Sequence, residues 1–293
     1  MSADRDPAEG LVREALAALP ATRTLAQAPL HRVRGGLSNH AWRADSGGRR
    51  YFVRLSGPDG ECLGVDRKSE CALVRAAASA AFAPAVLACE PSRGLLVMDF
   101  VSARPWRREE SHRLRNLRRL GQVLRDLHRL PPPPGVRRIS FKEQAARLEL
   151  QLAETEVVEP ELRDAVAAAH EALGSRGEGV ATCHNDLHHL NVLDDGERLW
   201  LVDWEYGGCG EPLMDLASYL CQHESSPPER QCLLAAYGET ESAPPDLVGA
   251  ACTVFDYVQW LWYRLWVARG RDAGGEYSAR AAAIADRLRA AAT

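Results

Sequence analysis

Two short segments of the chain combine carboxylate and amide side chains at a spacing that few folds can use. The first runs from His184 to Asn191 and reads His-Asn-Asp-Leu-His-His-Leu-Asn. The second is an apolar, strand-like run that begins at Leu199 and ends just before Asp203. Any one of these polar residues would be ordinary in a turn or at the end of a strand. Asp186, Asn191 and Asp203 together predict one site that handles both a proton and a metal ion.

The form His-x-Asp-x4-Asn, followed by an Asp at the end of a strand, is that of a protein-kinase catalytic loop and its metal-binding Asp. Phosphoryl transfer from ATP needs positioning and charge neutralisation more than covalent help. One carboxylate must face the incoming hydroxyl, and a second one, with an amide oxygen beside it, must hold Mg²⁺. The spacing therefore predicts Asp186 as the catalytic base and Asn191 and Asp203 as the magnesium ligands.

Length and charge limit the class of protein. With 293 residues, 46% of them hydrophobic, the chain is long enough for two lobes. The net charge of −4 gives no electrostatic reason to expect nucleic acid or an anionic membrane as a partner. Acidic residues near the N-terminus, without an apolar segment of signal-peptide length, favour a cytoplasmic protein. The oligomeric state is left open.

The eight cysteines show no Cys-x-x-Cys pair and no regular spacing. This pattern favours reduced, mostly buried thiols. A zinc site around Cys183, His184, His188, His189 and Cys209 is disfavoured, because their spacing matches no structural zinc pattern.

A glycine-containing turn lies between two predicted strands near the N-terminus. Leu30–Val33 and the segment around Trp42 read as strands, and a third follows at Tyr51–Leu55. Such a turn lets backbone N–H groups approach phosphate oxygens closely. The predicted phosphate-contacting residues of this turn are Gly35, Gly36, Ser38 and Asn39.

Arg54 and Glu70 are candidates for an ion pair that orients a cation onto the phosphates of ATP. Arg54 lies on the third predicted strand, which contains no lysine, and Glu70 lies on a helix predicted over residues 66–78. Both residues could instead be surface charges. The functional interpretation is favoured because the position requires a cation and Arg54 is available there.

The strand at residues 94–100 leads into a polar segment that we predict as the connection between lobes. Backbone groups of Asp99, Phe100 and Val101 are expected to face the adenine ring. Further helices are predicted over residues 114–127, ended by the four prolines at 131–134, and over 161–173.

These motifs, in this order, resemble the aminoglycoside phosphotransferase and choline kinase superfamily, from about Val33 to the C-terminus. The choline/ethanolamine kinase branch, with its bacterial thiamine-kinase-like relatives, is the most similar. The Asp-aromatic-Glu-Tyr run that begins at Asp203, the helix start at Met214–Ala217 and an aromatic C-terminal helix carry this resemblance. It implies an α+β, bilobal, protein-kinase-like fold. A small β-rich N-lobe would span residues 1–100, and a larger, mostly helical C-lobe would span 101–293.

The resemblance also implies ATP and Mg²⁺ as cofactors and the hydroxyl of a small cationic alcohol as the acceptor. Trp204 replaces the usual Phe, and Gln222 stands where an acidic residue is common, which leaves the identity of the cation open. Ring faces would bind the cation, with Asp256 or Glu205 supplying negative charge. The predicted substrate residues are Glu205, Tyr206, Asp256, Trp262, Tyr263, Trp266 and Tyr277.

The aromatic helix has a second interpretation. On a helical wheel Trp262, Tyr263 and Trp266 share one face with Phe255, and Asp256 lies at its edge. A cation over such rings gains roughly 0.5 to 2 kcal/mol per ring face. The same stripe would serve equally well as an aromatic core. Next to a kinase site, the cation pocket is favoured.

The predicted function is an ATP- and Mg²⁺-dependent kinase of a cationic alcohol, choline first. Ethanolamine, thiamine and an aminoglycoside are competing acceptors. A catalytically inactive, nucleotide-binding pseudokinase is a different class, disfavoured by the intact Asp186, Asn191 and Asp203. A protein kinase is disfavoured because no Ala-Pro-Glu segment follows Asp203.

Overall fold

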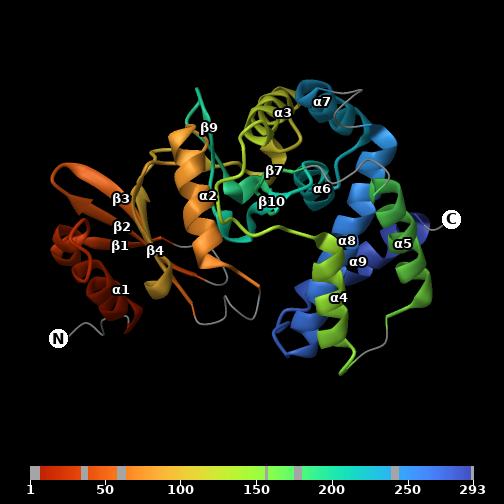
Figure 1. Cartoon of the computed structure of the whole chain (residues 1–293), viewed down its shortest axis with the longest axis horizontal. Coiled ribbons are helices and arrows are strands. Elements are labelled where there is room, and N and C mark those ends of the chain that lie inside the picture. The colour runs from red at the N-terminus through yellow and green to blue at the C-terminus, as the bar shows by residue number, and fades with distance from the viewer. Residues whose placement is uncertain are drawn as a thin grey trace. The chain divides into compact units, whose positions relative to one another are not determined.

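The computed structural model describes residues 7–33, 39–57, 64–155, 158–174, 180–238 and 244–291. The chain folds into two compact units (Figure 1). The first unit contains residues 1–106, 133–137 and 190–208, and the second contains residues 107–132, 138–189 and 209–293. The predicted lobes divide the chain once, at residue 100. The first unit, in contrast, also contains residues 133–137 and 190–208, which lie beyond that boundary.

A five-stranded antiparallel sheet with the order β1-β2-β3-β5-β4 forms the centre of the first unit. Gly47 and Gly48, with φ angles of 59° and 74°, make the tight turn between β2 and β3, a conformation that two-residue hairpins require. The strands are β1 Leu30–Val33, β2 Asn39–Ser46, β3 Arg49–Ser56, β4 Val86–Glu90 and β5 Leu95–Asp99.

Side chains alternate between the two faces of β3, and this alternation separates the core from the site. Val53 is fully buried in a hydrophobic core beneath α1 (Pro7–Ala17) and the 3₁₀ helix η1 (Arg23–Gln27). Arg54, the next residue, therefore lies on the opposite face. The core also contains Val12, Leu16, Leu25, Trp42, Leu95 and Val97.

Helix α2 (Arg67–Ser79) carries Glu70 and begins at a side-chain cap. The carboxylate of Asp66 accepts the N–H groups of Lys68 and Ser69 at 2.9 and 3.2 Å, which satisfies two donors that the first helical turn leaves unpaired. A second small sheet in this unit has the order β6-β8-β9. Its strands are β6 Arg104–Pro105, β8 Val192–Asp194 and β9 Leu199–Leu201.

A disulfide joins Cys71 of α2 to Cys89 of β4, with their Cα atoms 5.7 Å apart. The prediction that all the cysteines are reduced is therefore wrong for this pair. The two residues are 18 positions apart and belong to no spacing motif, so only the packing of α2 beside β4 brings them together. Among the described residues the other cysteines are free thiols, and Cys62 lies outside the described ranges.

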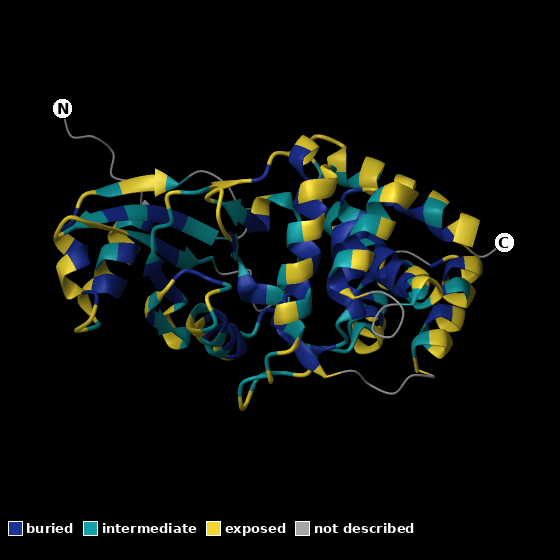
Figure 2. Ribbon diagram, turned by 90° about the horizontal axis from the view of Figure 1, so that it is seen from above, coloured by how far each residue is buried: buried dark blue, intermediate teal, exposed yellow. Residues whose placement is uncertain are grey.

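The second unit is mostly helical. Its longest helix, α8, packs against α4, α5, α6 and α9, and the buried sides of these helices are visible in Figure 2. The predicted α+β fold, with an antiparallel sheet in one part and helices in the other, is thereby confirmed. The helices are α3 Leu114–His128, α4 Phe141–Leu152, α5 Pro160–Gly174, α6 Leu213–Gln222, α7 Pro227–Tyr237, α8 Pro245–Ala268 and α9 Glu276–Ala291, with short strands β7 Ala181–Cys183 and β10 Gly208–Gly210.

Helices α3 and α7 approach each other closely at Gly121. A Cβ atom there would lie 2.6 Å from the carbonyl oxygen of Leu233, so a larger residue would push the helices apart. Helix α3 ends at His128, ahead of the proline run, as predicted.

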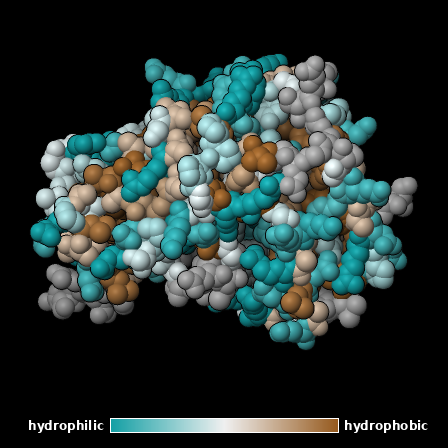
Figure 3. Space-filling model, in the orientation of Figure 1, coloured by the Kyte–Doolittle hydropathy of each residue, from teal (hydrophilic) through white to brown (hydrophobic). Residues whose placement is uncertain are grey.

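Hydrophobic residues form separate patches among hydrophilic ones on the face drawn in Figure 3. Within the described ranges, no helix is both long enough and apolar enough to span a lipid bilayer.

Candidate active site

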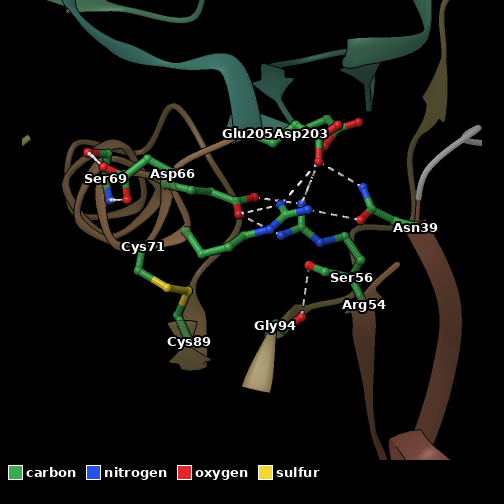
Figure 4. Close-up of polar contacts among 12 residues, drawn as sticks. Asn39, Arg54, Ser56, Asp66, Ser69, Cys71, Cys89, Gly94, Asp203 and Glu205 are labelled. Carbon is green, nitrogen blue, oxygen red and sulfur yellow. Dashed lines mark hydrogen bonds and ion pairs between the residues drawn. A yellow bond between two sulfur atoms is a disulfide. The ribbon is translucent and has the colours of Figure 1, made fainter. Parts of the chain in front are cut away.

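Arg54 and Glu70 form a buried, two-pronged ion pair in the first unit. Figure 4 shows Arg54 with the nearby side chains of Asn39, Asp203 and Glu205. The guanidinium group lies 2.6 Å from one carboxylate oxygen and donates to the other at 2.7 Å. The side chains are only 6% and 1% exposed. The predicted pairing is thus present, and the alternative of two surface charges is excluded by their burial.

The electrostatics show that both partners stay ionised. Burial alone would raise the pKa of Glu70, but the charges and hydrogen bonds of Arg54 and Arg67 hold it below its ordinary value. Burial alone would lower the pKa of Arg54, but the charge of Glu70 raises it instead. A pair of this kind is costly to break, because removing one partner strands a buried charge.

Asp203 and Glu205 extend this pair into a network. Asp203 lies 3.4 Å from Arg54, and Glu205 lies 3.1 Å from Arg67, which also contacts Glu70 at 2.8 Å. Two guanidinium groups thus face three carboxylates. Asp203 is the most exposed of the three, at 38%, against 1% and 5% for the others. Asp203 is therefore the carboxylate of this network that a ligand can reach most easily.

Asn39 closes the network on the β2 side. Its amide donates to Glu205 at 2.9 Å and accepts from Arg67 at 3.3 Å. Asn39 was predicted to contact phosphate from the glycine turn, and the structure places its side chain on Glu205 and Arg67. Gly35, Gly36 and Ser38, the other members of that prediction, lie outside the described residues.

Asn191 and Asp203 are brought together by the small sheet. Val192 pairs with Leu201, and the N–H of Val202 donates to the carbonyl of Asn191 at 3.0 Å, so Asn191 stands opposite the residue that precedes Asp203. A carboxylate and an amide supply the hard oxygen ligands that suit Mg²⁺.

Asp203 has a left-handed backbone, with φ 65° and ψ 64°. Asn185, next to the predicted catalytic base, has φ 63°. Such conformations are uncommon outside glycine and tend to cluster at functional sites. Asp203 is the predicted metal ligand, and Asn185 precedes the predicted base. The preferences of residue types for helix or strand do not predict either left-handed conformation.

The predicted hinge residues lie at the end of β5. Asp99 is bound by Arg49 at 2.9 Å, and Phe100 lies under the guanidinium groups of Arg43 and Arg50. Val101 follows in an irregular segment. The side chains of Asp99 and Phe100 are thus engaged within the sheet unit.

In the second unit, helix α6 holds the backbone of the loop that carries Asp186. The buried carboxylate of Asp215 accepts the N–H groups of His184 and Asn185 at 2.8 and 2.5 Å, and Ser218 accepts that of Leu187 at 2.9 Å. These bonds fix the residues on both sides of Asp186.

Asp215 is itself oriented by His128 of α3, whose Nε2 lies 3.0 Å away. Burial would raise the pKa of Asp215, but the hydrogen bond from His128 leads the effects that lower it. His128, Cys183 and Asp215 are close enough to hold a metal ion. We assign them a structural role, because both carboxylate oxygens already accept backbone N–H groups and burial raises the pKa of the Cys183 thiol.

His188 lies beside the predicted base, with its Nε2 3.8 Å from a carboxylate oxygen of Asp186. Burial, and then the charge of Arg280, lower the pKa of His188 to about 4. The imidazole is therefore neutral at neutral pH.

Four rings of α8 and α9 gather into what we call the aromatic cluster, made of Trp262, Tyr263, Trp266 and Tyr277. Trp262 lies 5.2 Å from Trp266 and 5.8 Å from Tyr277, and Tyr263 stacks on Tyr277 at 5.6 Å. Tyr263 is buried in the core of the unit, whereas the other three rings are partly exposed. The aromatic cluster thus belongs to the hydrophobic core at Tyr263 and is accessible to solvent at the other three rings.

The carboxylates predicted to supply charge are already paired. Asp256 is buried, and both its oxygens accept from Arg287, at 2.9 and 2.7 Å. Glu205 belongs to the network of Arg67 and Asn39 in the first unit. Tyr206 follows it in the 3₁₀ helix η5 (Trp204–Tyr206). Neither carboxylate is an unbalanced partner for a substrate cation.

Three residues of the site were not predicted. Arg67 is adjacent to the helix cap and resembles a surface charge in the sequence. Asp215 lies within the helix start Met214–Ala217, and no role was predicted for it or for His128. Burial is the signal that separates them from ordinary charges, and burial of a charge is not visible in one sequence.

The structure and its ion network are those of a kinase-like phosphotransferase. The chain belongs to the phosphotransferase enzyme family, whose model matches residues 29–247. It is similar to a choline/ethanolamine kinase family protein from Mesorhizobium loti, with 27% identity, a TM-score of 0.78 and coverage of 95% of this chain and 92% of the other. The suspected superfamily is thereby confirmed.

Two further relatives fit this assignment. The choline kinase LicA from Streptococcus pneumoniae shares the fold, with a TM-score of 0.80 at 19% identity, over 97% of this chain and 100% of that one. Protein LicA from Haemophilus influenzae is 40% identical over 55 residues, which are 19% of this chain. That match spans only 21% of the length of the curated relative.

Proposed function

We propose that this protein transfers the γ-phosphate of ATP to the hydroxyl group of a small cationic alcohol, with choline as the first candidate. The ion network around Asp203 carries the proposal. Asp203, the residue that the kinase pattern assigns to the metal, is the most exposed of the network's three carboxylates and lies beside the buried pair of Arg54 and Glu70.

The roles follow from the chemistry. Asp203 and Asn191 would hold Mg²⁺, which neutralises charge on the phosphates when it is bound. Arg54, kept in place by Glu70, would donate to phosphate oxygens. The hydroxyl oxygen of the acceptor would bond to the γ-phosphorus while ADP leaves, and Asp186 would accept the proton of that hydroxyl. The backbone bonds to Asp215 and Ser218 keep Asp186 oriented for this step.

The aromatic cluster supports a cationic acceptor. Trp262, Trp266 and Tyr277 are partly exposed, and ring faces attract weakly hydrated cations. The choline and ethanolamine kinases among the similar structures agree with this choice. The paired state of Asp256 also argues against an aminoglycoside, because several ammonium groups would require several unbalanced carboxylates.

A panel of choline, ethanolamine, thiamine and kanamycin, assayed for ATP consumption with Mg²⁺, tests the proposal. Choline should give the highest kcat/KM. The isostere 3,3-dimethylbutanol carries a tert-butyl group in place of trimethylammonium, so it should be a poor substrate. Equal rates for choline and 3,3-dimethylbutanol would show that the enzyme recognises the shape of the head group and not its charge. Nucleotide binding without turnover of any alcohol would favour the pseudokinase.

A further inference from the structure

Two arginines of the chain lie over rings of the aromatic cluster. The guanidinium carbon of Arg271 is 4.7 Å from the centre of the Trp266 ring, and that of Arg280 is 5.8 Å from the centre of the Tyr263 ring. Both distances fall within the range of cation–π attraction. A cation therefore already stands where the proposed substrate would place its ammonium group.

The two arginines are held differently. Arg280 donates to the hydroxyl of Tyr263 at 3.0 Å and to Glu276 at 2.6 Å, so it is tied to the cluster by directional bonds. Its charge also lowers the pKa of His188, next to Asp186. Arg280 thus lies within electrostatic reach of both the cluster and the catalytic loop, which favours the pocket interpretation of these rings.

The backbone at the end of helix α8 places Arg271 next to Trp266. Gly270 adopts a left-handed conformation with φ 70°, its N–H donates to the carbonyl of Val267 at 2.9 Å, and the N–H of Arg271 donates to the carbonyl of Trp266 at 3.0 Å. This pair of bonds is a Schellman motif, which brings the residue after the glycine back onto the last helical turn. The contact is therefore built by the backbone.

We infer that Arg271 occupies the cation position of the aromatic cluster and that a substrate ammonium group binds at Trp266 by displacing it. This inference rests on the proposed function in one respect, the cationic nature of the acceptor. Because Arg271 is exposed, its guanidinium can leave the ring for water while its backbone stays bonded at the helix end.

The size of the effect follows from the strength of the contact. An exposed cation–π pair favours the closed position by about 2- to 5-fold. The apparent affinity for an incoming cation is reduced by the fraction of molecules in which the ring is open. The ring is then open in about one third to one sixth of the molecules, so removing the guanidinium should tighten binding of every cation that uses the Trp266 face by about 3- to 6-fold. ATP binding should be unchanged.

Calorimetric titration with tetramethylammonium and with choline, without nucleotide, tests this inference. Arg271→Gln keeps the length of the side chain and removes its charge. Arg269→Gln is the matched control, because it makes the same charge change two residues away, where the side chain contacts Gln151 instead of a ring. Arg271→Gln should bind both ligands about 3- to 6-fold more tightly than the wild type, and Arg269→Gln should bind them like the wild type.

Three results would overturn the inference. Equal or weaker binding by Arg271→Gln would make Arg271 a part of the pocket or a bystander. Equal gains from both variants would show a general charge effect. Absence of tetramethylammonium binding to the wild type and to Arg271→Gln alike would show that the cluster is not a cation site. Turnover in the alcohol panel is measured separately, so loss of this inference and loss of the kinase assignment remain distinguishable.

Discussion

Arg54 uses one guanidinium group to bind both oxygens of Glu70, at 2.6 and 2.7 Å, and to approach Asp203 at 3.4 Å. Helix α2 is thereby connected to the proposed metal ligand through a single side chain. A shift of α2 would move Glu70, release Arg54 and change the charge around Asp203. We expect nucleotide binding to depend on this connection.

The first prediction concerns the coupling of Arg54 and Glu70. Each single variant, Arg54→Gln or Glu70→Gln, should lower kcat/KM for ATP, and the double variant should lose less than the sum of the two losses, because each residue orients the other. Unfolding free energies should show the same pattern, with single losses of about 3 kcal/mol, since either change removes the shortest ion-pair contact of a buried charge. Additive losses in kcat/KM would reduce Arg54 to an independent contact, whatever the stabilities show.

The second prediction concerns Asp203. Asp203→Ala removes the most exposed carboxylate of the network, the proposed metal ligand, so Mg²⁺-dependent ATP binding should be lost. Equilibrium titration of ATP with and without Mg²⁺ measures this loss. Asp45→Ala, which removes a carboxylate bound by Arg43 on the same sheet, should bind Mg-ATP like the wild type. Unchanged affinity in Asp203→Ala would remove this residue from the metal site.

The third prediction separates binding from chemistry at Asp186. Asp186→Asn should lower kcat by about 100-fold or more, the usual contribution of a general base, with nearly unchanged ATP affinity. Asp195→Asn is the control, because Asp195 accepts backbone N–H groups in the exposed turn after β8. Losses of affinity and rate by equal factors would indicate a metal or structural role for Asp186.

The sequence predicts those parts of the molecule that depend on local pattern. Local pattern places Arg54 on a strand and Glu70 on a helix, the kinase pattern pairs the two residues, and the proline run is enough to end α3. The role of Arg67 depends on tertiary contact, since it is shared by Glu70 and Glu205, which are 135 positions apart in the chain. No spacing rule describes such a contact.

The same limit applies to Asp215 and to the cysteines. Asp215 matters because it accepts N–H groups from a loop 30 residues earlier, and the disulfide forms because α2 packs beside β4. Asp256 shows the opposite case, in which a carboxylate placed correctly on the helix is neutralised by Arg287 from α9. Partners of this kind are fixed by packing, which one sequence does not display.

The fourth prediction concerns the disulfide. Cys71→Ala/Cys89→Ala should lower the unfolding free energy by about 3 kcal/mol, the value for closing a loop of this length. A thiol reductant should lower the stability of the wild type similarly and leave the double variant unaffected. Cys232→Ala, which changes a free thiol of α7, is the control. Equal stability of wild type and double variant would show that the bond is not formed in solution.

The fifth prediction concerns His223, at the end of α6. Burial is the main cause that lowers its pKa, to about 3, and the nearby groups His189, Arg108, His112 and His188 lower it further. The ring stays neutral in the folded state, where its Nε2 accepts the N–H of His189 at 3.2 Å.

In the unfolded chain this imidazole regains a pKa of about 6.5. The unfolded state therefore binds more protons than the folded state between about pH 6.5 and 3, and stability falls as the pH decreases through this window. His223 alone should cost about 2 kcal/mol between pH 7 and pH 5. Gln cannot be protonated there, so in urea denaturation at these two pH values His223→Gln should lose about 2 kcal/mol less than the wild type. An equal loss in both proteins would show that His223 is already protonated, or solvated, in the folded state.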